Sequence, residues 1–430
     1  MIGRQTNGIA ERNASISTGL RMALVAGSLV AAAARADENW SQFRGPGGQG
    51  MSDSTGVPVT WSESENIAWK TPLPGRGWSS PVVWDGQIWM TSAIDEGHSL
   101  HALCVDLASG RLLHDVEVFQ VEKPPHLNTK NSYASPTPVI EPGHVYVHFG
   151  TMGTACLATD TAKVEWTNRD LHLDHSMGPG SSPILYRDLL IFNCDGMDVQ
   201  YVVALNKHTG KIAWKTDRSG KPDVRVDRRK AFCTPLVIPI HGHDELISPG
   251  AGAVISYEPN SGKELWKVVY SPGYSNVPRP VYGHSRLFIG TGYDKAQLWA
   301  IRPEGHGDMT ASNVVWKMTS QAPLNPSPVL WGDELYVVSD NGVATCVNAA
   351  TGEQFWRHRL GGDFSASPVW AEGRVYFPSE SGATTVVQTG HEYKELAVNQ
   401  LDGRIMASPA IVGRAIILRT DANLYRIEAK

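Results

Sequence analysis

The chain has 430 residues, of which 41% are hydrophobic and 19% charged, and its formal net charge is −5. This composition fits a folded globular protein rather than a disordered one, and the charge argues against a broad nucleic-acid-binding surface. The five cysteines lack metal-ligand spacing, so we expect buried small hydrophobic residues, at least one of them unpaired.

The N-terminal segment has the pattern of a secretory signal. Arg21 precedes a short apolar run over 22–34, and an A-x-A cleavage site ends at Ala36. The run is too short for a convincing membrane span, and no cysteine follows it for lipid attachment. We predict that residues 1–36 form a signal peptide, with translation starting at the first methionine or at Met22, and that the mature protein is periplasmic or extracellular.

Residues 37–66 are polar and rich in turn-forming residues. They include the stretch Trp40-Ser-Gln-Phe-Arg-Gly-Pro46. We expect an extended arm that lies on the following domain and is anchored by Trp40 and Phe43, not an independent fold.

From residue 67 to residue 430 one pattern of short strands recurs eight times. Each unit opens with a proline followed by strand-forming residues, and the polar turn before the fourth strand leads in several units to Gly-x-x-x-Trp, as in Gly210 to Trp214. Units of about 45 residues with four short antiparallel strands are typical of propeller blades. The opening prolines are Pro81, Pro138, Pro183, Pro235, Pro280, Pro328, Pro368 and Pro409.

The two ends of the repeat region complement each other. The last unit stops after its third strand, at 424–428, whereas an unpaired fourth strand at 66–73 precedes the first unit. Joining them would close the ring and remove exposed sheet edges. The sequence therefore predicts an all-β, eight-bladed β-propeller of four-stranded antiparallel blades, in which the N-terminal strand completes the last blade.

The units resemble the pyrroloquinoline quinone (PQQ) repeat, with its A-x-D-x-x-T-G-x-x-x-W core. The best copies are Ala204-Leu-Asn-Lys-His-Thr-Gly-Lys-Ile-Ala-Trp214 and Val347-Asn-Ala-Ala-Thr-Gly-Glu-Gln-Phe-Trp356. The resemblance covers roughly residues 60–430 and implies that the tryptophans dock neighbouring blades rather than bind a cofactor. These docking residues are Trp69, Trp166, Trp214, Trp266, Trp316 and Trp356.

Two functions occur among proteins with this repeat. One is that of PQQ- and calcium-dependent alcohol or sugar dehydrogenases, and the other is that of non-catalytic propellers similar to the outer-membrane assembly factor BamB. The chain lacks the adjacent cysteine pair of many alcohol dehydrogenases and their long insertions, and it lacks the lipobox cysteine of BamB. The resemblance is strongest to exported BamB-like propellers, which implies a monomeric scaffold that binds an envelope protein, extended peptide or polymer. It implies no catalytic residue, although an enzyme is not excluded.

Function should lie on one face of the ring, where the loops that enter the first strands and those that join the second and third strands surround the channel. These loops carry a mixture of basic, amide, aromatic and acidic residues that could hold a polar ligand or an extended peptide, or could form only salt bridges. The candidate binding residues of this channel face are Arg76, Trp78, Asn131, Tyr133, His175, Asp195, Arg279, Tyr293, Asp294, Asp340, Glu380 and Arg404.

A PQQ site would need cations for the quinone carboxylates, oxygen ligands for Ca²⁺ and a carboxylate base. Arg76, Arg279 and Arg404 could supply the first, and Asp195, Asp294 and Asp340 the others, with Trp78 as an aromatic wall. These residues belong to different blades, so we expect no cofactor and keep PQQ with calcium as the alternative.

Other motifs are weaker. His172-Leu-Asp-His175 and His241-Gly-His243 invite a metal interpretation but lack a third ligand, so we expect no metal site there. The basic loop 224–230 could be a solvated loop or a patch for an anionic partner. No nucleophile elbow, P-loop or dinucleotide fingerprint is present.

Overall fold

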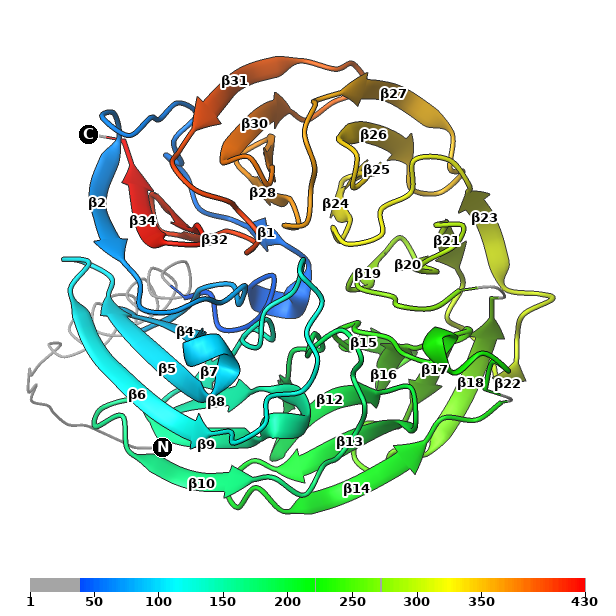
Figure 1. Cartoon of the computed structure of the whole chain (residues 1–430). Helices are drawn as coiled ribbons and strands as arrows, with labels where there is room; N and C mark the ends of the chain where they lie inside the picture. Colours follow the sequence, from blue (N-terminus) through cyan, green and yellow to red (C-terminus); the bar gives the residue numbers. More distant parts are fainter. Residues whose placement is uncertain (1–38, 221, 271–272, 430) are drawn as a thin grey trace, which may run out of the picture. The chain divides into compact units, whose positions relative to one another are not determined.

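The computed structural model describes residues 39–220, 222–270 and 273–429. The predicted signal peptide lies outside these residues. Eight sheets surround a common axis (Figure 1). Within each blade the four strands are antiparallel, and all eight blades predicted from the sequence are present, which confirms the all-β, eight-bladed propeller.

The blades follow the chain in order. The first blade consists of β3 (Val82–Trp84), β4 (Gln87–Ile94), β5 (Ser99–Asp106) and β6 (Leu112–Gln120), and the second of β7 (Val139–Glu141), β8 (His144–His148), β9 (Thr154–Ala158) and β10 (Val164–Asn168). The third consists of β11 (Ile184–Tyr186), β12 (Leu189–Asp195), β13 (Gln200–Asn206) and β14 (Ile212–Asp217). The fourth consists of β15 (Leu236–Ile240), β16 (His243–Pro249), β17 (Ala253–Tyr257) and β18 (Glu264–Val269), with β22 (Gly307–Asp308) added parallel to β18. The fifth blade consists of β19 (Val281–Gly283), β20 (Arg286–Gly290), β21 (Leu298–Ile301) and β23 (Val314–Met318). The sixth consists of β24 (Val329–Trp331), β25 (Glu334–Val338), β26 (Val343–Asn348) and β27 (Gln354–Arg359). The seventh consists of β28 (Val369–Ala371), β29 (Arg374–Pro378), β30 (Ala383–Gln388) and β31 (Glu395–Gln400), with β1 (Met51–Ser52) added parallel to β28.

The eighth blade joins the two ends of the chain. Strands β32 (Ala410–Val412), β33 (Ala415–Arg419) and β34 (Asn423–Glu428) are completed by β2 (Ile67–Pro72), in which Lys70 pairs with Tyr425. The register confirms the predicted closure. Because closure leaves no blade with an open lateral neighbour, each blade buries apolar side chains against the next.

The Gly-x-x-x-Trp pattern has a direct packing reason. Trp69 of the eighth blade donates its indole N–H to the carbonyl oxygen of Leu107 at 3.0 Å, and its ring covers Gly110 of the first blade so closely that an added Cβ would lie 2.5 Å away. Gly110 has φ +72°, which favours glycine independently of the contact. The same arrangement pairs Trp166 with Gly210, Trp214 with Gly262 and Trp316 with Gly352.

Two of the predicted docking tryptophans depart from this arrangement. Trp356 donates to the carbonyl oxygen of Gly390 in the seventh blade at 3.0 Å. Trp266 is fully buried and donates instead to the carboxylate of Glu245 in its own blade at 2.6 Å. In the fifth blade the connection between β21 and β23 is a longer loop containing β22, and Gly307 of β22 pairs with Trp266 in a parallel ladder.

The arm passes through the middle of the ring, with η1 (Pro46–Gly48) and β1 near its centre (Figure 1). Trp40 pairs with Val83 of the first blade. Arg44 is completely buried and donates to the carbonyl oxygens of Pro328 and Pro368, at 2.5 and 3.1 Å. Burial lowers the pKa of Arg44 to about 9. The arm is therefore part of the propeller interior, bonded to blades far apart in the sequence.

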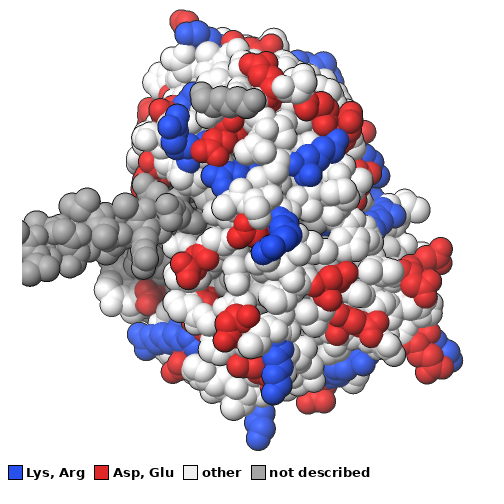
Figure 2. All heavy atoms as spheres, turned by 90° about the vertical axis from the view of Figure 1, so that its left-hand side faces the viewer, with Lys and Arg blue, Asp and Glu red and all other residues white. Residues whose placement is uncertain are grey.

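The remaining helices are short 3-10 turns: η2 (Asp95–Gly97), η3 (Gly150–Met152) and η4 (Val226–Arg228). Within the described part of the chain, no helix has both the length and the apolarity needed to cross a membrane. The side of the ring that carries β2 and β6 shows basic and acidic side chains interspersed, with neither sign forming a continuous field (Figure 2). All five cysteines are free and buried, as predicted.

Candidate binding cavity

A cavity of about 570 Å³ lies on the channel face. Its lining combines aromatic, amide and hydroxyl groups from most of the blades, and Phe43 of the arm contributes to it. The larger lining side chains are Phe43, Trp78, Asn128, Lys130, Asn131, Met177, Asp227, Lys230, Phe232, Tyr274, Tyr293, Leu324, Asn325, Asp340 and Met406. A concave site with apolar walls and a few polar groups is the usual form of a ligand site.

A ring of hydroxyl residues surrounds the channel at the point where each innermost strand begins. The residue directly before the opening proline is serine or threonine in seven blades, and it is Arg279 in the fifth blade. The backbone N–H of Ser80 donates to Thr137 Oγ1 at 2.9 Å, and the same bond links successive blades around the ring except the fourth and the fifth. The other links join Thr137 to Ser182, Ser182 to Thr234, Arg279 to Ser327, Ser327 to Ser367, Ser367 to Ser408 and Ser408 to Ser80.

Six of these residues also line the cavity: Ser80, Thr137, Ser182, Thr234, Ser367 and Ser408. Each oxygen already accepts a backbone N–H, and apart from Ser367, which donates to Ser327 at 3.1 Å, none donates its hydroxyl hydrogen to another described residue. A hydroxyl has one donor and two acceptor sites. Five hydroxyl donors are therefore left for a ligand or solvent in the cavity.

The charged residues of the lining are engaged locally. Lys130 forms an ion pair with Glu380 at 2.8 Å, and Lys230 donates to the backbone carbonyl of Asp227. Asp340 accepts the backbone N–H groups of Leu324 and Asn325, at 2.7 and 3.2 Å. Burial raises the pKa of Asp340, and these hydrogen bonds oppose the shift. The groups left free to bind are mainly neutral.

Four of the candidate residues line this cavity: Trp78, Asn131, Tyr293 and Asp340. Trp78 donates its indole N–H to the carbonyl oxygen of Lys130 at 3.1 Å, which fixes the ring at the wall. Asn131 donates to the carbonyl oxygens of Met177 and Pro179, whereas Tyr293 is half exposed.

Five candidates lie beside the cavity. Arg76 and Tyr133 line a separate pocket formed with residues 93–97, and the Arg76 guanidinium lies 4.8 Å from the Trp78 ring centre. Arg404 forms an ion pair with Glu380 at 2.9 Å. Asp294 forms one with Arg228 at 2.6 Å. Arg404, Glu380 and Asp294 therefore form salt bridges, which is the second of the two possibilities that the sequence left open for the loops of the channel face.

His175, Asp195 and Arg279 are buried and do not line the cavity. His175 Nε2 accepts the backbone N–H of Thr151 at 3.0 Å, and burial lowers its pKa to about 4. Asp195 accepts hydrogen bonds from Nε and Nη2 of Arg218, at 2.5 and 2.7 Å. Arg279 anchors the arm by donating to the carbonyl oxygen of Phe43 at 2.5 Å.

These placements do not fit the residues nominated for a quinone and calcium site. None of the three nominated arginines lines the cavity, and Asp195 and Asp294 are paired with separate arginines. Among the described residues, the three nominated aspartates do not form a group whose oxygens approach within 4.8 Å.

The histidine motifs and the basic loop also have local partners. His243 contacts Glu245 at 3.0 Å, and His241 contacts Glu304 at 3.5 Å. In the basic loop, Arg225 pairs with Asp227 at 2.7 Å. Arg228 forms an ion pair with Asp294, whereas Arg229 and Lys230 donate to backbone carbonyl oxygens. Two of the loop's four basic side chains are therefore paired with a carboxylate.

The hydroxyl ring was missed from the sequence although a signal for it was present. The prolines that open the units are preceded by Ser or Thr in seven of eight cases, as in Ser80-Pro81 and Thr137-Pro138. Lys130 and the amides Asn128 and Asn325 carry no repeated pattern, so only the ring geometry places them in the cavity.

Comparison with known proteins agrees with this architecture. The family model for "Outer membrane protein assembly factor BamB" matches residues 308–430. Among curated proteins, BamB of Burkholderia pseudomallei is 34% identical over 96 residues, 22% of this chain and 24% of that protein. BamB of Shewanella oneidensis is 24% identical over 173 residues, 37% of this chain and 38% of that protein. The matched region thus spans about a quarter to two fifths of these relatives.

Solved structures show the fold over a larger span. BamB from Moraxella catarrhalis has a TM-score of 0.59 at 11% identity, covering 84% of this chain and 99% of that chain. A europium-containing methanol dehydrogenase has a TM-score of 0.67 at 11% identity, covering 92% of each chain. The chain is thus a β-propeller built from PQQ-like repeats. Within that class it is BamB-like, which confirms the resemblance inferred from the repeats.

Proposed function

We propose that the protein is an exported, non-catalytic scaffold that binds an extended segment of a cell-envelope protein in the channel-face cavity. The observation that carries the proposal is the lining itself: aromatic walls, side-chain amides and five free hydroxyl donors, with the charged residues engaged elsewhere. A peptide backbone offers carbonyl acceptors for the hydroxyls, and its side chains can pack on Trp78 and Tyr293. The similarity to BamB supports an envelope partner. The signal pattern of residues 1–36 supports export, and we expect a monomer.

Site-specific photo-cross-linking in cells tests this function. A photoreactive phenylalanine analogue at Tyr293, which is half exposed at the cavity, should give discrete adducts with an envelope protein. The same analogue at Val398, which is 58% exposed on the outer strand β31, is the matched control. Equal adducts at both positions, or none at Tyr293, would contradict a cavity-bound partner.

The structural similarity to a methanol dehydrogenase is a similarity of fold, and it makes PQQ the second ligand to test. We expect no retention of PQQ with Ca²⁺ in equilibrium dialysis and no dye reduction with simple alcohols or sugars. Reproducible reduction would overturn the scaffold proposal in favour of a quinoprotein dehydrogenase.

A further inference from the structure

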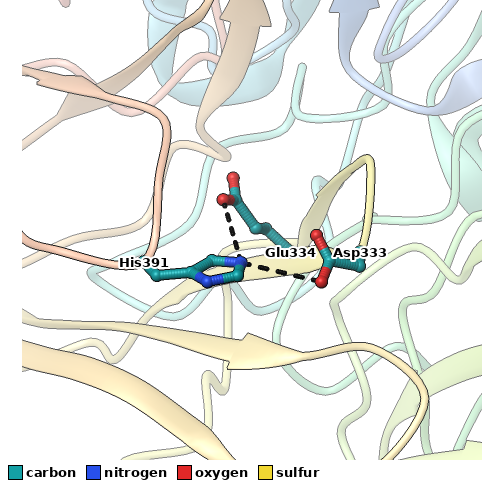
Figure 3. Close-up of side chains that lie close together, drawn as sticks. All are labelled: Asp333, Glu334 and His391. Carbon is teal, nitrogen blue, oxygen red and sulfur yellow. Dashed lines mark ion pairs between the residues drawn. The ribbon is translucent and has the colours of Figure 1, made fainter.

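Three potential metal ligands meet between the sixth and seventh blades, away from the channel-face cavity (Figure 3). Asp333 and Glu334 belong to the hairpin between β24 and β25, and His391 lies in the turn between β30 and β31. The imidazole Nε2 lies 3.6 Å from an Asp333 oxygen and 3.7 Å from a Glu334 oxygen. Metal–ligand bonds of about 2.1 Å place tetrahedral ligands about 3.4 Å apart. Both distances from the imidazole are close to that ligand spacing and too long for hydrogen bonds, and all three ligand atoms lie within 4.8 Å of one another.

Glu334 supplies an independent reason for a cation. The residue is only 8% exposed, and one of its oxygens accepts the hydroxyl of Tyr336. The other oxygen makes no hydrogen bond to a described residue and faces His391. The carboxylate of a side chain that is only 10% exposed is costly unless it is paired or coordinates a metal. No described lysine or arginine forms an ion pair with Glu334, so a bound cation would satisfy it.

In the first blade, the position equivalent to Glu334 carries a neutral side chain that is satisfied by hydrogen bonds alone. Gln87 occupies the register of Glu334, since Trp84 pairs with Gln87 as Trp331 pairs with Glu334. The Gln87 amide donates to the carbonyl oxygen of Thr159 in the next blade at 3.0 Å, and its oxygen accepts the indole N–H of Trp89. A glutamate cannot donate to that turn. At the sixth blade the neighbouring turn instead presents a histidine.

The surroundings hold His391 in place while leaving the site open. Its ring stacks on Phe355 with 3.8 Å between ring centres and an interplanar angle of 10°. The preceding Gly390 donates its N–H to the Tyr336 hydroxyl at 2.9 Å, which is also the hydroxyl that donates to Glu334. The side chains of His391 and Asp333 are 54% and 57% exposed, so an ion and its remaining water ligands can enter.

We propose that Asp333, Glu334 and His391 bind one divalent transition-metal ion of the zinc type, which links the sixth blade to the seventh. One imidazole nitrogen with two carboxylate oxygens suits Zn²⁺ and similar ions, whereas Ca²⁺ and Mg²⁺ favour all-oxygen sites. The site is separate from the cavity, so it does not depend on the proposed function.

Equilibrium dialysis of the full untagged chain against micromolar Zn²⁺, with bound metal quantified, tests the proposal. His391→Gln should lose one equivalent of zinc, and Glu334→Gln should bind that ion at least about tenfold more weakly. Gln87 shows that this fold accommodates glutamine at the position of Glu334, so the second variant remains informative if the first fails to fold. His208→Gln is the matched control, because His208 contacts a single carboxylate, Asp188, at 3.1 Å.

A second readout reports coordination directly. Co²⁺ added to the wild-type chain should give visible d–d absorption of a low-coordinate site, and His391→Gln should abolish it while His208→Gln leaves it unchanged. Equal zinc stoichiometry and affinity in the wild-type chain and both site variants, or Co²⁺ absorption that survives in His391→Gln, would overturn the assignment.

Discussion

Replacing Gly210 with alanine tests whether the repeated glycine exists for the tryptophan of the preceding blade. The residue has φ +70°, and the new methyl would lie 2.4 Å from the Trp166 ring. The left-handed backbone costs about 1 kcal/mol for alanine. Moving the ring by about 1 Å also breaks the 2.8 Å bond from the Trp166 indole to the carbonyl oxygen of Lys207, a further loss of about 1 kcal/mol with some packing. We expect the free energy of unfolding to fall by about 2–3 kcal/mol.

Gly143 is the matched control. It has φ +85° in a hairpin turn, and an added Cβ there would meet no atom within 4 Å. Gly143→Ala should therefore cost only the backbone component, about 1 kcal/mol. Urea unfolding followed by far-ultraviolet circular dichroism measures both variants.

A double-mutant cycle isolates the contact between the two blades. With Trp166→Ala as background, Gly210→Ala should cost no more than Gly143→Ala, because the ring that it displaces is gone. The reasoning is refuted if the two glycine variants cost the same in the wild-type background. It is refuted equally if the excess cost of Gly210→Ala persists after Trp166 is removed.

Three further perturbations probe the interior. Thr137→Val should lower the free energy of unfolding by about 1–3 kcal/mol in urea titrations, because it leaves the buried N–H of Ser80 without an acceptor; Thr137→Ser keeps the hydroxyl and should cost less. Arg218→Met leaves the buried carboxylate of Asp195 without its ion-pair partner and should lower the free energy of unfolding by about 3–5 kcal/mol. Adding Asp195→Asn should recover part of that stability. Burial lowers the pKa of His148 to about 3, so the unfolded chain takes up a proton at this residue at a higher pH than the folded chain does. The contribution of the neutral, buried His148 to the free energy of unfolding is therefore complete above the unfolded pKa of about 6.5 and declines as the pH falls toward 3. The loss is about 2 kcal/mol at pH 5. His148→Gln should flatten the dependence of the unfolding free energy on pH between 7 and 5 by that amount.

Each of these predictions has a contradicting result. Equal stability of the valine and serine variants would show that the ring hydrogen bonds contribute nothing measurable. No recovery in the Arg218 and Asp195 double variant would mean that the cost of Arg218→Met lies in packing rather than in an unpaired charge. An unchanged pH slope in His148→Gln would assign acid destabilisation to other groups.

The fold could be predicted in detail because its determinants are local and repeated. Each proline that opens a strand and each glycine followed by a tryptophan acts within its own unit or on the next one, so spacing alone gives the number of blades. The unpaired strand before the first unit identified the ring closure, since a sheet lacking its fourth strand must find one. The hydroxyls before the prolines were also visible in the sequence, but their meaning depends on the neighbouring blade.

The candidate site could be predicted only in part, because loops that look alike in the sequence end at different depths. Asp195 ends the second strand of its blade and Asp340 closely follows the second strand of another, yet Asp340 lines the cavity while Asp195 is buried against Arg218. The difference depends on which partner the adjacent blade presents, and no single unit contains that information.

The amino-acid sequence by itself determined the blade, its number of copies and the strand that closes the ring, because hydrophobic alternation and turn residues act over a few positions. Only the tertiary structure decided the path of the arm, since the carbonyl oxygens that hold Arg44 come from two different blades. It likewise decided the meeting of Glu334 with His391, because these residues come together only where one blade packs against the next.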